Sequence, residues 1–192
     1  MNSYLETIKA VDGEIFNLSY HQKRYDAVLE SLKAIEKDDL GKYLNPPEYG
    51  VYRCRLVYTA ESIEVTYHEY KKREINSLKI VFDNDIEYAN KFTCRNKIDA
   101  LFETREEADD ILIVKDLLVR DTSIANIAFY DNGVWLTPKS PLLKGTTRDR
   151  LLDEGKLTEA DIKIQDIRKY KKVALMNAMI DFYVLENCEF LI

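Results

Sequence analysis

Histidine, cysteine and glycine are scarce in this chain of 192 residues, and their scarcity limits the chemistry that it can carry. The two histidines, His21 and His68, are too few for a histidine-rich metal site, so we expect no metal. The six glycines are scattered, and the sequence contains no phosphate-binding loop, dinucleotide-binding turn or GxSxG nucleophile motif. Acid–base chemistry would therefore depend on lysine, a carboxylate, tyrosine or a bound cofactor.

An excess of positive charge is also lacking. Lysine and arginine number 28 against 34 aspartates and glutamates, which gives a net charge of −6 and no general attraction for nucleic acid or acidic membranes. The three cysteines, Cys54, Cys94 and Cys188, are odd in number and far apart, a pattern typical of reduced thiols in a cytoplasmic protein. The sequence has no signal-peptide pattern and no apolar run long enough for a membrane span, so we expect a cytoplasmic protein.

What the chain does contain is the composition of a globular protein, with 46% hydrophobic and 32% charged residues. Residues 4–11, 51–59 and 63–70 are expected to form strands, the last two from period-two alternation. An Asp12-Gly13 turn predicts a hairpin between the first strand and residues 14–18. A long helix with an apolar stripe follows the hairpin. Short apolar runs predict buried strands in the second half, and residues 157–162 are expected to form a short helix. We infer an α+β protein in two halves that are joined near residues 83–91.

The stretch PLLKGTTRDRLL, residues 141–152, allows two interpretations. In the first, Thr146 caps a helix and Asp149 reaches back to the exposed N–H of the cap. In the second, the N–H groups and hydroxyls at the start of the helix bind a phosphate, because helix N-termini favour anions. Taken alone, the stretch favours the cap, because such caps are common.

Several longer stretches form a pattern that covers almost the whole chain: LETIKAVDGEIFNLSYHQKRYDAV, NKFTCR, ADDILIVKDLLVRDTSIANIAFYDNGVWLTP, LLKGTTRDRLL and VALMNAMI. In this order they resemble the class IV aminotransferase family. These are pyridoxal-phosphate (PLP) enzymes of fold type IV, including branched-chain and D-amino acid aminotransferases and 4-amino-4-deoxychorismate lyase. The resemblance implies a small N-terminal α/β sandwich over residues 1–86 and a larger C-terminal pseudo-barrel that binds the cofactor over residues 87–192.

The resemblance also implies residues for the reactive end of PLP. The cofactor is attached to a lysine that later moves a proton, and Lys91 in NKFTCR fits this role better than the nearby Lys97. The pyridine nitrogen needs a carboxylate partner. Asp121 stands where relatives usually carry glutamate, five residues before Asn126, so a shorter side chain must do the same work.

For the phosphate, the resemblance implies a fixed cation and two donor turns. It places Arg24 as the cation, and it favours the phosphate interpretation for the GTT segment; the residues implied as donors are Thr146, Thr147, Asn177 and Ala178. Arg53 and Arg55 lie on one face of an expected strand and could hold a substrate carboxylate. The alternative for this arginine pair is an ordinary exposed strand face.

Three functions remain open at this point. The first is a lyase that acts on a small amino-carboxylate, like 4-amino-4-deoxychorismate lyase, and releases pyruvate to give 4-aminobenzoate. The second is an amino-acid transaminase of the branched-chain or D-amino acid type. The third is a non-catalytic remnant of the fold, suggested because relatives carry about two dozen residues ahead of the strand that matches residues 4–11. The family also implies a homodimer.

Overall fold

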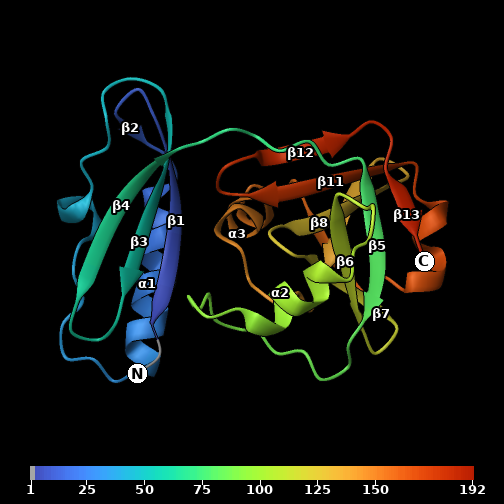
Figure 1. Cartoon of the computed structure of the whole chain (residues 1–192), viewed down its shortest axis with the longest axis horizontal. Helices are drawn as coiled ribbons and strands as arrows, with labels where there is room; N and C mark the ends of the chain where they lie inside the picture. The colour runs from blue at the N-terminus through green and yellow to red at the C-terminus, as the bar shows by residue number, and fades with distance from the viewer. Residues whose placement is uncertain (1–2) are drawn as a thin grey trace. The chain divides into compact units, whose positions relative to one another are not determined.

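A computed structural model describes residues 3–192 and shows two compact units (Figure 1). Unit 1 extends to Lys72 and also includes Asn90–Cys94, whereas unit 2 comprises Arg73–Ala89 and Arg95–Ile192. This division differs from the expected one at residue 86. Strand β5 (Ser77–Phe82) pairs with β6 (Asp110–Lys115) inside unit 2, and this pairing places the segment after Lys72 in the second unit.

Unit 1 is an antiparallel sheet packed against one helix. The sheet order is β2-β1-β3-β4, and the strands are β1 (Tyr4–Val11), β2 (Glu14–Ile15), β3 (Val51–Tyr58) and β4 (Ile63–Glu69). Asp12 and Gly13 join β1 to β2 with positive φ angles of 48° and 83°, as expected for a tight hairpin turn. In the chain, a short 3-10 helix, Leu40–Tyr43, follows this α-helix and precedes β3.

The core of unit 1 lies between one face of this sheet and α1 (Leu18–Ser31). Alternate residues of β1 are buried, and they pack with Tyr25, Val28 and Leu29 of the helix. We call the opposite face of the sheet the open face, because its side chains alternate with those of the core and are more exposed.

Unit 2 is built from two sheets. The four-stranded sheet has the order β13-β5-β6-β7, with β7 at Leu118–Thr122 and β13 at Glu189–Leu191. The five-stranded sheet has the order β10-β9-β8-β11-β12; its strands are β8 (Asn126–Asp131), β9 (Val134–Pro138), β10 (Thr158–Ala160), β11 (Lys172–Asn177) and β12 (Asp181–Leu185). Apolar side chains from both sheets share one core, which includes Leu112, Phe129 and Leu175.

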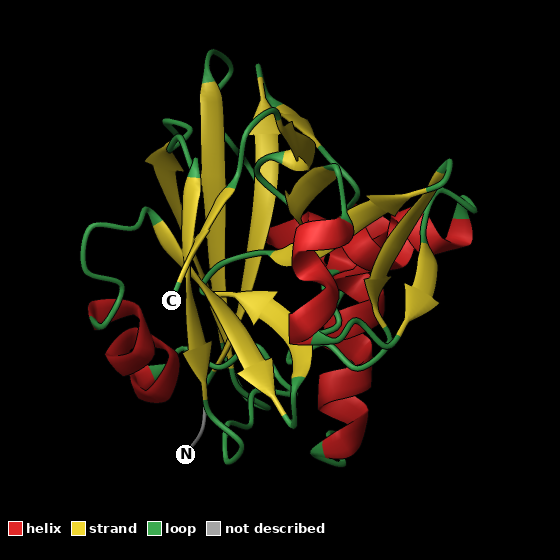
Figure 2. Cartoon of the chain, turned by 90° about the vertical axis from the view of Figure 1, so that its right-hand side faces the viewer, coloured by secondary structure: helices red, strands yellow, loops and turns green. Residues whose placement is uncertain are grey.

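Two α-helices and a 3-10 helix complete unit 2 (Figure 2): α2 (Asn96–Glu103), α3 (Thr146–Asp153) and Ile164–Lys169. The helix expected over residues 157–162 is wrong, because Thr158–Ala160 form β10, which pairs in parallel with β9. Pairing along the edge of an existing sheet overrides the local helical signal. Among the described residues, no helix is long and apolar enough to cross a membrane.

Candidate active site

Lys91 lies beside β1 in unit 1. The N–H of Leu5 donates to the Lys91 carbonyl at 2.8 Å, and Tyr4 forms an antiparallel bridge with Phe92. The Tyr4 and Phe92 rings lie 5.1 Å apart on the side of the core. The same register puts Lys91 opposite Leu5, whose place in the alternation of β1 belongs to the open face.

Lys97, the other lysine considered from the sequence, lies on α2 of unit 2. Its Nζ is 3.3 Å from a carboxylate oxygen of Asp83, and about half of its side chain is exposed. An exposed ion pair of this kind is ordinary for a surface lysine.

Arg24 lies on α1, on the core side of the same sheet. Its Nε and Nη2 atoms donate to the two oxygens of Glu6 at 2.7 and 2.6 Å. His21 Nδ1 is 2.6 Å from Glu6 Oε2, and it must donate there because an ionised carboxylate only accepts. Burial raises the pKa of Glu6, but the Arg24 charge and the hydrogen bonds from His21 and Arg24 outweigh it and lower the pKa to about 2.

Glu6 connects the two functional candidates of unit 1. It follows Leu5, whose N–H binds the Lys91 carbonyl, so Arg24 and Lys91 both lie at this stretch of β1. Glu6 and His21 were not identified as site residues from the sequence. A glutamate within the buried alternation of β1, Tyr4-Glu6-Ile8-Ala10, was the available signal.

Arg53 and Arg55 lie on the open face of β3, on either side of the buried Cys54. In the register of the sheet, Arg55 is opposite Thr7 and Arg53 is opposite Lys9. The two arginines therefore share a face with Leu5, the residue opposite Lys91.

In unit 2, Asp121 lies near the end of β7 and is almost fully buried. One carboxylate oxygen accepts from Asn126 Nδ2 at 2.7 Å, and the other accepts from the N–H of Leu143 at 2.9 Å. Burial raises the pKa of Asp121 to about 6, although these hydrogen bonds and the Arg148 charge act in the opposite direction. The Leu142 N–H is a further backbone donor to this carboxylate, which has four lone-pair positions in all, so one is left for another donor.

The GTT segment packs against Asn126. A Cβ atom on Gly145 would lie 2.1 Å from Asn126 Oδ1, so only glycine fits this approach. The expected Thr146 cap is wrong: Gly145 is the N-cap residue, and no side-chain hydrogen bond caps the helix. The first helical bond runs from the Asp149 N–H to the Gly145 carbonyl. The amides of the first turn before Asp149 are therefore free of helical bonds, and the Thr146 and Thr147 side chains are buried beside them.

Asn177 and Ala178 begin the turn between β11 and β12. The Asn177 side chain accepts from the N–H groups of Met179 and Ile180, and its amide is 3.2 Å from the carbonyl of Ile124. Met176 is directly opposite Asn126 in the register of β11 and β8.

The unit 2 candidates therefore collect at one end of the five-stranded sheet. Asp121 and the start of α3 both contact Asn126, and the Asn177 turn lies at the end of the strand beside it. This end combines a buried carboxylate with free helix amides. It can hold a protonated ring nitrogen and a phosphate.

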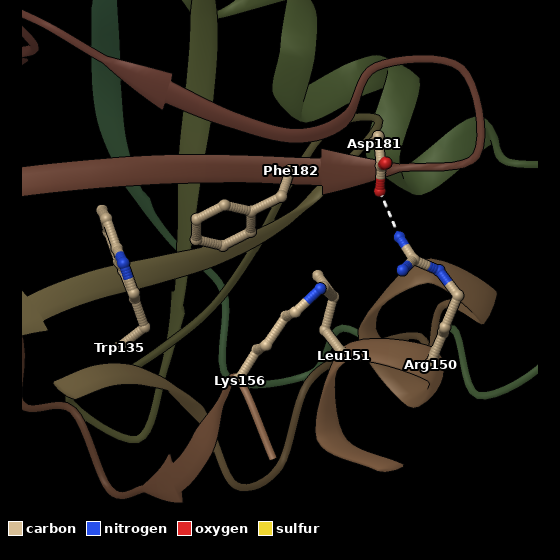
Figure 3. Close-up of a pocket in the computed structure, with 6 residues that line it drawn as sticks. All are labelled: Trp135, Arg150, Leu151, Lys156, Asp181 and Phe182. Carbon is tan, nitrogen blue, oxygen red and sulfur yellow. Dashed lines mark hydrogen bonds and ion pairs between the residues drawn. The ribbon is translucent and has the colours of Figure 1, made fainter. Parts of the chain in front are cut away.

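A separate pocket of about 360 Å³ also lies in unit 2 (Figure 3). Its lining residues are Trp135, Arg150, Leu151, Lys156, Asp181 and Phe182. Arg150 pairs with Asp181 and Glu154, and Lys156 also pairs with Glu154, so the cations at this pocket are neutralised. None of the site residues expected from the sequence lines it.

Comparison with known proteins gives concordant matches. The model of the amino-transferase class IV family matches residues 3–184. An "uncharacterized protein" of Haemophilus influenzae is 35% identical over 185 residues, which cover 93% of this chain and 98% of the relative. The crystal structure of a "putative 4-amino-4-deoxychorismate lyase" from Haemophilus somnus superposes with a TM-score of 0.85 and 34% identity, covering 93% of this chain and 97% of that one.

A more distant structure has the same fold. A "hypothetical aminotransferase" from Mycobacterium tuberculosis, in its PLP-bound form, superposes with a TM-score of 0.77 at 14% identity. It covers 97% of this chain, and 81% of that chain is matched. These matches confirm the fold type and the family resemblance predicted from the sequence.

Proposed function

The chain belongs to the class IV aminotransferase family of PLP-dependent enzymes, and from that premise we propose that it binds PLP and acts as a lyase on an amino-carboxylate substrate. The specific reaction that we propose is release of pyruvate from 4-amino-4-deoxychorismate to give 4-aminobenzoate. The relative from H. somnus, matched over nearly its whole length, supports this choice of substrate.

The residues of the chain fit the cofactor. The observation that carries the proposal is the joint placement of Asp121 and the open start of α3 around Asn126. A buried carboxylate with a pKa of about 6 is mostly ionised at pH 7.5 and can hold a proton on a ring nitrogen. The amides around Thr146 and Thr147 can hold a phosphate, and Arg24, fixed by Glu6, supplies a cation.

When bound, PLP supplies a ring that accepts electrons from the carbon bearing the substrate amine. Lys91 would hold the cofactor covalently through Nζ, and its amine, when free, would take the proton from that carbon. Asp121 keeps the ring nitrogen protonated. Arg24, Thr146, Thr147, Asn177 and Ala178 hold the phosphate end. In the lyase reaction, that proton would pass to Lys91 and the C–O bond to the enolpyruvyl group would break, so that the ring becomes aromatic. The released enolpyruvate would take up a proton and become pyruvate.

A transaminase is the second candidate function, and the arginines of β3 favour it. Of the two, Arg55 is nearer to Lys91 in the register of the open face, so it can hold the carboxylate of an amino acid whose amine is directed to the lysine. Lys91 would then move the proton to the cofactor instead of completing an elimination. A bound but inactive cofactor would point to the third function, a non-catalytic remnant.

We also propose that the protein forms a homodimer in the cytoplasm. The dimer is an implication of the family. The three cysteines are all free thiols, which suits a reducing compartment. Sedimentation at several protein concentrations tests the dimer.

Absorbance of the purified protein before and after borohydride tests the cofactor. We expect a visible band that reduction fixes to the chain and that Lys91→Ala abolishes, whereas Lys97→Ala leaves it unchanged. A protein that takes up no added PLP would overturn both enzyme functions. Turnover of 4-amino-4-deoxychorismate without a keto acid supports the lyase, and an absolute requirement for a keto acid supports the transaminase.

A further inference from the structure

The register of unit 1 arranges the open face in rows that cross the sheet. The first row contains Lys91, Leu5 and Val57, and the second contains Thr7, Arg55 and Thr66. The third row contains Phe16, Lys9, Arg53 and His68, because the Phe16 N–H donates to the Lys9 carbonyl at 2.9 Å. A hydrogen bond of 2.5 Å between the Ser3 and Thr93 hydroxyls supports the placement of Lys91, since Ser3 and Thr93 lie next along the same face.

Three cations of these rows lack ionic partners. Among residues 3–192, Lys9, Arg53 and Arg55 form no ion pair, although the chain as a whole is acidic. Lys9 Nζ lies 5.9 Å from the centre of the Phe16 ring, at the distance of a cation–π contact. Glu64 lies at the far end of the first row, and it forms no ion pair with these cations.

The rows place the cations at graded distances from Lys91. Strands lie about 4.8 Å apart and alternate residues about 6.8 Å apart, so the Cα of Arg55 is about 12 Å from that of Lys91. The same spacing puts Lys9 about 14 Å and Arg53 about 17 Å away. Arg55 is therefore near enough for a carboxylate close to the reacting amine, whereas Lys9 and Arg53 reach a group at the far end of a longer molecule.

We propose that Lys9 and Arg53 form a subsite for a second carboxylate, so that the enzyme selects amines that carry one carboxylate near the amine and another across a ring. This inference rests on the proposed function, because it takes Lys91 as the reacting residue. Arg55 binds the near carboxylate in both the lyase and the transaminase reactions. The Lys9–Arg53 pair adds selection for a dicarboxylate, and it makes Lys9 a specificity-determining residue.

Binding of two aromatic probes to the PLP-loaded protein tests the subsite. Benzoate carries one carboxylate, and benzene-1,4-dicarboxylate carries a second one across the ring. By titration calorimetry at low salt, we expect the dicarboxylate to bind about tenfold more tightly, the factor that one charge-assisted hydrogen bond supplies. Lys9→Gln and Arg53→Gln should each remove this preference and leave benzoate binding unchanged, whereas Arg55→Gln should weaken both probes.

Lys42→Gln is the matched control, because Lys42 is an exposed lysine of unit 1 outside the open face. It should leave both affinities unchanged. Equal affinity of the wild-type protein for the two probes would overturn the subsite. A dicarboxylate preference that survives both Lys9→Gln and Arg53→Gln would overturn it as well.

The borohydride experiment separates this inference from the proposed function. If PLP is fixed at Lys91 and the two probes bind equally, the subsite fails and the proposed function stands. If no PLP is taken up, the proposed function fails. A dicarboxylate preference that depends on Lys9 in the unloaded protein would then still establish the anion subsite.

Discussion

Glu6 and Arg24 form a two-point ion pair between the first strand and the first helix, with Nε–Oε1 and Nη2–Oε2 distances of 2.7 and 2.6 Å. Glu6 is fully buried, and Arg24 is 15% exposed. Such a pair fixes the plane of the guanidinium, because both parallel hydrogen bonds must be satisfied at once. Glu6 is thus a positioning residue for the cation that we assign to the cofactor phosphate.

Glu6→Gln tests this positioning role. The variant keeps the shape of the side chain but removes the charge and one acceptor, so we expect PLP affinity to fall about tenfold. Affinity for pyridoxal, which lacks the phosphate, should stay the same. Fluorescence titration with both compounds gives the ratio of affinities. A parallel loss for PLP and pyridoxal would show that Glu6 matters only for folding, and Glu61→Gln, in an exposed loop, is the control.

The lowered pKa of Glu6 predicts that the free energy of unfolding decreases in acid. The folded pKa of Glu6 is about 2, below its ordinary value of 4.5, so its stabilisation is complete above pH 4.5 and is lost as the pH falls toward 2. Between pH 7 and pH 3 this amounts to about 2 kcal/mol. We expect denaturant titrations to show a smaller drop for Glu6→Gln than for the wild type. An identical drop in both proteins would contradict the assignment.

The raised pKa of Asp121 predicts the opposite pH dependence of the free energy of unfolding, in the protein without cofactor. Its folded pKa of about 6 lies above the ordinary value of 3.8, so ionisation destabilises the fold as the pH rises from 3.8 through 6. The full effect is about 3 kcal/mol. Asp121→Asn should reduce the loss of stability between pH 4 and pH 7.5 by about 2 kcal/mol, because the unfolded aspartate is already mostly ionised at pH 4. The amide also removes one acceptor. Unfolding at the two pH values measures it, and an unchanged difference would refute it.

Asp121→Asn should at the same time impair the PLP-loaded enzyme. An asparagine cannot hold a proton on the ring nitrogen through an ionic pair, so turnover is expected to fall at least about a hundredfold. PLP should still be fixed to the chain by borohydride. Turnover at the wild-type rate would remove Asp121 from the site.

Gly145→Ala tests the contact between α3 and Asn126. The new methyl would meet Asn126 Oδ1 at 2.1 Å, so the loop or the strand must shift, at a cost of about 2 kcal/mol. We expect lower stability and weaker PLP binding. The double variant with Asn126→Ala, which removes the obstructing amide, should cost less than the sum of the two single changes. Strict additivity would show that the two residues do not collide.

The sequence predicted the features that depend on local pattern. Alternation located β1, β3 and β4, and the Asp12-Gly13 turn located the first hairpin. Each of these signals acts between residues that are near in the chain, so it can be read without knowing the fold.

The features that the sequence did not predict depend on distant partners. Glu6 faces inward because its cation is on a helix 18 residues away. Gly145 precedes α3 without a side chain, because Asn126 on the distant strand β8 occupies the space that a side chain would need. The segment at Thr158 becomes a strand because β9 offers it an edge. Tertiary contacts of this kind override local propensity.

Residues 90–94 belong to unit 1, so unit 1 can finish folding only after part of unit 2 has been synthesised. This segment pairs with β1, yet the chain builds β5 for unit 2 before it returns to unit 1. On a ribosome, the residues that pair with the edge of the first strand therefore emerge nearly ninety positions after it. Lys91 therefore pairs with β1 only late in synthesis. A fragment that ends at Lys72 would lack Phe92, and the ring of Tyr4 would lose that contact.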